Sequence, residues 1–224
     1  MNAQNDISIR ISPRQGQIVI EEDADGVLTR KRIDRSDLVQ CFRESLVCKD
    51  ERSASGFLPL NTIAVDQTSQ EKRFTVWYPR LYADVSLYDT PYPHFPIPRL
   101  VSSFALSNEG KVSRCRIGVV DDETPSPGTA MYHYPFSNVG RNDHHLCIGA
   151  NELPVYKMPH KATTLPAFLL SIPNNMHYFN TTDNRLGMEY RELMEHLKDK
   201  DPAYYYSDIL IPSGKTLGQF IKQM

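Results

Sequence analysis

The chain has 224 residues, a formal net charge of −2 at pH 7 and 40% hydrophobic residues. This length allows one large domain, or a core domain with an added element, and it can bury a sizeable core. The near-neutral charge excludes a general attraction to nucleic acid or to an anionic membrane surface. No apolar run reaches the roughly 18 residues of a membrane-spanning helix, and the start of the chain lacks a signal-peptide pattern. We therefore expect a cytoplasmic protein that binds neither nucleic acid nor membrane.

The four cysteines are widely spaced and include no Cys-x-x-Cys pair. The sequence therefore supports neither a zinc ribbon nor a disulfide framework, and reduced thiols are expected. Cys41 and Cys48 would lie two turns apart on a predicted helix, with backbones about 11 Å apart, which is too far for a disulfide. Cys115 lies on the apolar face of a predicted strand, which indicates a buried core thiol.

Three extended runs open the chain; they cover residues 7–11, 17–20 and 27–33. Asp25-Gly26, between the last two runs, is a strong turn signal, so residues 1–33 are assigned to an N-terminal β-hairpin extension. From residue 34 the apolar residues recur with helical period. This pattern predicts a helix of about 13 residues, whose first turn Asp34 or Ser36 can cap.

An antiparallel meander is predicted next, because strand-like runs with period-two alternation follow one another closely. The expected strands cover residues 57–65, 74–78, 81–88 and 100–106, with one more around residue 117. Four prolines between residues 91 and 98 are expected to interrupt the sheet. Two extended runs are expected at residues 204–206 and 209–211. Helices are expected at residues 165–172, beginning at Thr164, then at residues 186–200 and near residues 217–221. The fold class is therefore α+β, an antiparallel meander sheet with helices packed on one side.

The stretch with the clearest chemistry lies between residues 132 and 149. It reads Tyr-His-Tyr-Pro-Phe-Ser-Asn-Val at residues 132–139 and Leu-Cys-Ile-Gly at residues 146–149. Cys147 thus follows Asn138 by nine positions, and Asn138 itself follows a proline-aromatic turn. A thiolate can act as a nucleophile or an acyl carrier, and an amide N–H can donate to the oxygen that becomes negative when a carbonyl is attacked.

The loop ahead of Cys147 offers further candidates. Asp143, His144 or His145 could tune the thiol or deprotonate an attacking amine, because imidazole titrates near neutral pH. His133 is a further candidate for lining the site. The structural alternatives are solvated loop histidines and a Cys147 that is an ordinary core residue. A metal site is disfavoured, because adjacent histidines point apart on a strand and no fourth ligand is close in sequence.

These motifs resemble those of ubiquitin-conjugating enzymes, which carry a His-Pro-Asn turn and, shortly after it, a Gly-x-Ile-Cys-Leu element with the acceptor cysteine. The sequence is more similar to the bacterial branch called prokaryotic ubiquitin-conjugating-enzyme-like family D, and the resemblance spans residues 74–179. His133 does not directly precede Pro135 here, and the loop between Asn138 and Cys147 is one residue longer than in the eukaryotic pattern. The resemblance implies a ubiquitin-conjugating-enzyme-like domain at residues 34–224.

The resemblance also implies a function. It implies a bacterial enzyme that accepts a ubiquitin-like modifier as a thioester on Cys147 and transfers it to a target, with Asn138 as the oxyanion donor. The partners it implies are the modifier, a ThiF-like activating enzyme that uses ATP and magnesium, and a JAB-type peptidase, in a plasmid-borne or antiphage-defence setting. Because the activating enzyme carries the cofactors, none is expected on this chain.

Two alternatives accompany this hypothesis. A binding module of the same fold would recognise a ubiquitin-like protein or its activating enzyme without covalent chemistry, and its Cys147 would be buried and unreactive. A cysteine hydrolase would pair Cys147 with a histidine such as His133 or His177. The hydrolase is the weaker alternative, because the sequence carries no signature of such peptidases.

Overall fold

The computed structural model describes residues 6–12, 17–24, 27–46 and 56–223. Contacts between residues divide the chain into two compact units, Met1–Ala54 and Ser55–Met224. The boundary between the two units therefore lies after the predicted helix. The domain boundary expected from the sequence, between residues 33 and 34, lies before that helix. The candidate residues between positions 133 and 147 all belong to the second unit.

The first unit is an antiparallel sheet of three strands followed by one helix. The strands are β1 (Asp6–Ser12), β2 (Gln17–Ala24) and β3 (Val27–Ile33), with β2 in the centre. The predicted turn at residues 25–26 lies outside the described residues, and so does Cys48. Helix α1 (Arg35–Leu46) begins as predicted, because the Asp34 carboxylate accepts a hydrogen bond from the Asp37 N–H at 2.9 Å.

The second unit is built on a six-stranded sheet in which every neighbouring pair is antiparallel, as predicted. The strand order is β11-β10-β9-β8-β5-β4. The strands are β4 (Thr62–Gln67), β5 (Glu71–Tyr78), β8 (Leu100–Ser107), β9 (Val112–Val120), β10 (Ala130–Tyr132) and β11 (Pro212–Thr216). Strand β8 is buried on both faces, which explains its nearly unbroken run of apolar and small residues.

Strands β6 (Leu81–Leu87) and β7 (Thr90–Ile97) form a separate two-stranded sheet between β5 and β8 in the sequence. The prediction that residues 81–88 continue the main meander is therefore wrong. The prolines at residues 91–96 do not interrupt a sheet either, because they lie within β7. In the described part of the chain β7 pairs only with β6, and an edge strand tolerates residues that lack an N–H on its outer side.

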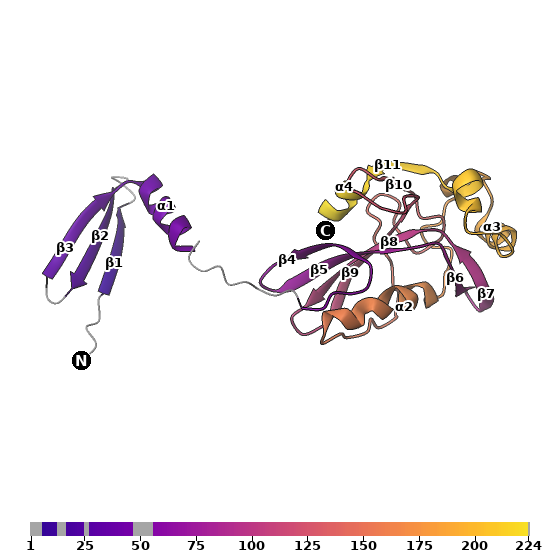
Figure 1. Cartoon of the computed structure of the whole chain (residues 1–224), viewed down its shortest axis with the longest axis horizontal. Helices are drawn as coiled ribbons and strands as arrows, with labels where there is room; N and C mark the ends of the chain where they lie inside the picture. Colours follow the sequence, from indigo (N-terminus) through magenta and orange to yellow (C-terminus); the bar gives the residue numbers. More distant parts are fainter. Residues whose placement is uncertain (1–5, 13–16, 25–26, 47–55, 224) are drawn as a thin grey trace. The chain divides into compact units, whose positions relative to one another are not determined.

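Helices cover both faces of the main sheet, so the prediction of helices on one side is wrong. On one face, α2 (Leu165–Ser171) and α3 (Tyr190–Leu197) share a core with Phe104 of β8. On the other face, α4 (Leu217–Lys222) packs with Val101 of the same strand. Figure 1 shows α2 and α4 on opposite sides of the sheet. Both faces need cover because successive side chains of β8 point to opposite sides and both sets are buried.

The remaining helix predictions were confirmed in part. Helix α2 follows Thr164 and has proline in its first turn, as expected. Helix α3 is shorter than residues 186–200, because Gly187 has a φ of +64° and Glu189 is still extended. Residues Tyr205–Ile209 form a π-helix, which contradicts the extended run predicted at residues 204–206, whereas Leu210, within the second predicted run, is extended. The Tyr205 side chain is fully buried, and its hydroxyl donates to the Pro96 carbonyl at 2.9 Å. No helix among the described residues has the length and apolarity to cross a membrane.

Candidate active site

The two halves of the motif form the two arms of a short hairpin. The Cys147 N–H donates to the Asn138 carbonyl at 2.7 Å, and Val139 pairs with Leu146 in an antiparallel bridge. Closer to the tip, the Gly140 N–H donates to the His145 carbonyl at 2.9 Å. Asn138 and Cys147, nine positions apart in the sequence, therefore lie opposite each other at the open end of the hairpin, with their backbones in direct contact.

The hairpin extends the main sheet beside β9. Strand β10 pairs with β9 only through the last two residues of β9, Val119 and Val120. The hairpin pairs with the earlier part of the same edge of β9, which β10 leaves free. The Leu146 N–H donates to the Cys115 carbonyl at 2.9 Å, and the Ile117 N–H donates to the His144 carbonyl at 3.0 Å. The position of Cys147 is thus fixed by backbone hydrogen bonds on two sides.

The tip of the hairpin is held by charged side chains. Arg141 donates to Thr182 at 2.8 Å and forms an ion pair with Asp183 at 3.0 Å. Lys215 of β11 donates to the Asn142 carbonyl. Asp183 is 5% exposed, and its burial raises the pKa of this carboxyl, although Arg141 opposes the shift. Contacts from two later segments, residues 182–183 and strand β11, therefore position the loop that precedes Cys147.

Cys147 lies in an open groove of about 470 Å³. The residues that line it include Arg114, Cys115, His145, Gly149 and Tyr178. Both thiols border this groove, but their environments differ. Cys147 is partly exposed, whereas Cys115 is 2% exposed and burial raises the pKa of its thiol to about 12. Cys115 is a protonated core residue at neutral pH, as predicted, and Cys147 is the accessible thiol of the groove.

Backbone conformations with positive φ gather around this groove. Arg114, Gly149 and Tyr178 line it with φ values of +53°, +56° and +63°. Asn138 and His144, in the hairpin, have φ values of +66° and +58°. The left-handed region is costly for arginine and tyrosine, and such strain is concentrated at functional sites in proteins. Positive φ values also occur outside the groove, at Asn61, Tyr88 and His94, so they support a functional site here only together with the accessible thiol.

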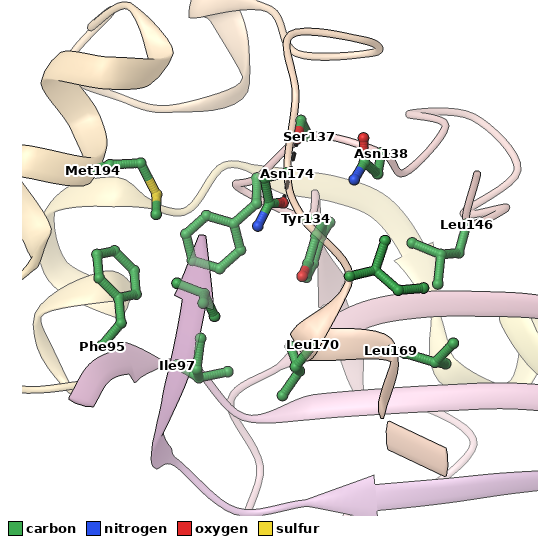
Figure 2. A pocket seen from close by; sticks show the side chains of 13 residues that line it. Phe95, Ile97, Tyr134, Ser137, Asn138, Leu146, Leu169, Leu170, Asn174 and Met194 are labelled. Atoms are coloured by element: carbon green, nitrogen blue, oxygen red, sulfur yellow. Dashed lines mark hydrogen bonds between the residues drawn. The ribbon is translucent and has the colours of Figure 1, made fainter. Parts of the chain in front are cut away.

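The side chain of Asn138 points away from the groove and into the protein. It is 4% exposed, and its Nδ2 donates to the Pro173 carbonyl at 3.1 Å, while its Oδ1 is buried without a hydrogen-bond partner among the described residues. Asn138 lines an internal cavity of about 10 Å³ together with Tyr134, Ser137 and Asn174, as Figure 2 shows. It is not among the described residues that line the groove of Cys147. In this conformation its amide supports the loop at Pro173.

The two loop histidines point in opposite directions. His145 is exposed and borders the groove, and its backbone N–H donates to the Asp143 carboxylate at 3.1 Å. His144 is 1% exposed, and its ring meets the Phe220 ring edge-on at 5.4 Å. Burial, assisted by the nearby Lys215 ammonium, lowers the pKa of His144 to about 4. His144 is therefore a neutral residue of the core beside α4.

The other candidates lie around the site rather than in the groove. His133 is partly buried, and burial lowers its pKa, with a further contribution from the positive charge of Arg141. His177 is exposed, and its carbonyl accepts from the Asn138 N–H at 3.1 Å. In the described residues, no three His, Cys, Asp or Glu side chains are placed to hold a metal ion. Of the candidate residues, His145 lines the same groove as Cys147, and Asp143 is hydrogen-bonded to the His145 backbone.

Arg114 and Tyr178 are groove residues that the sequence did not indicate. Arg114 lies in β9 and forms an ion pair with Glu71 at 3.0 Å, while Tyr178 belongs to the loop after α2 and is 61% exposed. Both are far from Cys147 in the sequence, and neither belongs to a motif. Only the pairing of the hairpin with β9, and the hydrogen bond from Asn138 to His177, bring them to the groove.

A curled antiparallel sheet with few helices is consistent with a ubiquitin-conjugating-enzyme-like fold. The family model Prokaryotic E2 family D, where E2 denotes the ubiquitin-conjugating enzymes, matches residues 38–213. The chain belongs to prokaryotic E2 family D, which confirms the family expected from the motif. Comparisons with curated proteins and with solved structures give no match.

Proposed function

We propose that this protein accepts a ubiquitin-like modifier on Cys147 and transfers it to a target. The observation that carries the proposal is the contrast between the two thiols: Cys147 is accessible at the mouth of a backbone-fixed hairpin, and Cys115 is buried with a raised pKa. Membership of prokaryotic E2 family D supports the same conclusion. A thiolate is the side chain best suited to hold an acyl group in a reactive form.

The proposed reaction has two acyl-transfer steps. In the first, Cys147 Sγ attacks the activated C-terminal carbonyl carbon of the modifier; a carbon–sulfur bond forms, and the activating group leaves with the electron pair of the bond that breaks. In the second, an amine of the target attacks the thioester carbonyl, a carbon–nitrogen bond forms, and Cys147 leaves as a thiolate. His145 is the proposed base for the amine proton, because it is the histidine that borders the groove.

Asp143 and Asn138 have supporting parts in this proposal. The Asp143 carboxylate fixes the backbone at His145, so it is a positioning residue. The Asn138 side chain would act as an oxyanion donor only after its amide turns from the Pro173 carbonyl toward the groove. The modifier, a ThiF-like activating enzyme with ATP and magnesium, and a JAB-type peptidase are the proposed partners.

The test is to mix the protein with the activating enzyme and modifier encoded beside it, with ATP and magnesium, and to measure intact mass with and without thiol reductant. We expect an adduct of modifier mass that reductant removes. Cys147→Ala should abolish it, Cys147→Ser should give an adduct that resists reductant, and Cys115→Ala should retain it. An adduct on the Cys147→Ala variant would refute the assignment.

One observation favours a second candidate, a non-catalytic module that binds the modifier. The Asn138 amide is buried and engaged by Pro173, so the oxyanion donor is not in place in this conformation. The same experiment separates the two functions when binding of the modifier is measured beside adduct formation. Tight binding that is unchanged by Cys147→Ala, with no adduct at any time, would favour the module and contradict transfer.

A further inference from the structure

A second cavity, of about 290 Å³, shares no lining residue with the groove of Cys147. Its floor is the main sheet: Tyr78 pairs with Leu100, and Ser102 pairs with Ile117, so these side chains stand on one face. Its other walls come from β6 and from Ala167 in α2. Walls from four strands and a helix make it a pocket for a compact molecule.

Two buried hydroxyl groups in this pocket have no hydrogen-bond partner among the described residues. They are Ser102 Oγ, on a residue that is 2% exposed, and Tyr78 Oη. Both residues belong to the floor of the pocket. Buried polar atoms are nearly always paired in proteins, and leaving one unpaired is costly. Both oxygens are closed off from the pocket space in this conformation, so they are part of its wall and are not contact points for a ligand.

The charge around the pocket selects among ligands. Asp84 of β6 is the charged residue that lines it, and no lysine or arginine does so in the described part of the chain. The Asp84 carboxylate is oriented by the backbone N–H of His94, which donates to it at 2.8 Å. The neighbouring Tyr82 is 43% exposed and stacks on His94, with ring centroids 4.2 Å apart. A carboxylate beside an aromatic face attracts a cation and repels an anion.

The size of the pocket sets the size of the ligand. A cavity of about 150 Å³ is enough for one benzene ring, so about 290 Å³ accommodates a fused two-ring system. We propose that this pocket binds an aromatic amine of about two rings, with its rings between the sheet and α2 and its ammonium group at Asp84. The proposal is independent of acyl transfer at Cys147, because the two sites share no residue.

The test is isothermal titration of the full-length protein with tryptamine and with indole-3-propionate, which have the same ring system and opposite charges. We expect saturable one-to-one binding of tryptamine and at least tenfold weaker binding of indole-3-propionate. Asp84→Asn keeps the shape and the hydrogen bond to His94 and should abolish the difference between the two compounds. Equal binding of both compounds to the unmodified protein, or no binding of tryptamine, would overturn the proposal.

A second variant locates the binding. Ala167 is exposed on α2 and lines the pocket, so Ala167→Phe should fill the pocket and weaken tryptamine binding at least tenfold. Ala203→Phe, at an exposed alanine outside the pocket, is the matched control and should bind as the unmodified protein does. Thermal unfolding verifies that each variant folds. If Ala167→Phe does not fold, the Asp84→Asn titration decides, and unchanged binding in a folded Ala167→Phe variant contradicts the site.

Discussion

At the scale of single residues, the candidate site depends on the different environments of two cysteines that border one groove. Cys115 belongs to the core, and burial raises the pKa of its thiol to about 12, so almost none of it is thiolate at neutral pH. Cys147 is partly exposed and lies in the groove. The rate of thiol chemistry follows both the thiolate fraction and access, and the same groove contains one accessible thiol and one shielded, protonated thiol.

This difference predicts the outcome of limited alkylation. At pH 7.5, iodoacetamide should modify Cys147 at least roughly tenfold faster than Cys115, because the Cys115 thiol is both protonated and shielded. Peptide mass spectrometry over a time course measures the two rates in one sample. Alkylation in denaturant is the control, since unfolding should make the rates similar. Comparable rates in the folded protein would contradict the assignment of Cys147 as the accessible thiol.

Asn138 gives a second prediction at this scale. Its side chain donates to Pro173, and its φ of +66° is a conformation that asparagine tolerates better than alanine. Asn138→Ala should therefore lower the free energy of unfolding by about 1–3 kcal/mol, measured by urea denaturation. Asn138→Gly, which accepts the same φ, separates the two causes and should cost less. A stability unchanged in both variants would show that the bond to Pro173 contributes nothing.

At the scale of elements, the sheet is stabilised by helices on both faces. Phe220 of α4 is fully buried in the smaller core cluster, and its ring meets His144 of the hairpin edge-on. Helix α4 is also well capped, because Thr216 and Gln219 exchange hydrogen bonds between side chains and backbone at its first turn. The helix therefore links one face of the sheet to the loop that precedes Cys147.

Removing this contact should be costly. Phe220→Ala should lower the free energy of unfolding by about 3–5 kcal/mol, because it deletes a buried aromatic ring and leaves a cavity. Lys222→Ala, at an exposed position of the same helix, is the matched control and should change stability by less than about 0.5 kcal/mol. Chemical denaturation monitored by circular dichroism measures both. A small effect of Phe220→Ala would mean that α4 adds little to the core.

The sequence predicted those elements whose apolar pattern is local. The antiparallel main sheet, the start of α1 at Asp34, helix α2 after Thr164 and the helix near residue 217 all follow from spacing and capping. The prolines of β7 were misassigned, because their tolerance depends on the strand having only one partner. The sequence also did not predict which face of the sheet α4 covers, because that depends on tertiary packing.

The site shows the same division. The motif predicted that Asn138 and Cys147 belong to one site, and the structure brings their backbones into contact through a hydrogen bond. The motif did not indicate that the Asn138 amide would point to Pro173 or that His144 would pack on Phe220, because adjacent residues in a hairpin face opposite sides and the outcome depends on the surrounding core. The sequence could not predict that Tyr178 lines the groove, because Tyr178 belongs to a loop that is distant from Cys147 in the sequence.

At the scale of the whole molecule, stability should depend on pH through His144. Its pKa is about 4 in the folded protein and 6.5 for an ordinary histidine, so between these values the unfolded chain binds the proton more readily. The free energy of unfolding should therefore be constant above about pH 7 and fall as the pH is lowered from about 6.5 to about 4, by up to about 3 kcal/mol from this residue.

The comparison that isolates this contribution is His144→Gln. Lowered pKa at His133 acts in the same direction as His144, and the raised pKa of Asp183 acts in the opposite direction at lower pH. Both groups are present in the unmodified protein and in the variant, so the difference between their urea denaturation curves at pH 7.5 and pH 5 reports His144. A variant whose stability changes with pH as steeply as that of the unmodified protein would count against the assignment.

The contacts that hold the tip of the hairpin determine when, during translation, the loop before Cys147 can form. Arg141 is held by Asp183, and Asn142 is held by Lys215, so the loop before Cys147 depends on segments that the ribosome makes about 40 and 70 residues later. During translation, Cys147 leaves the ribosome well before its loop can be completed. We expect a nascent chain that stops short of Lys215 to expose the thiol without a formed groove, so that the groove around Cys147 is completed only after Lys215 has been synthesised.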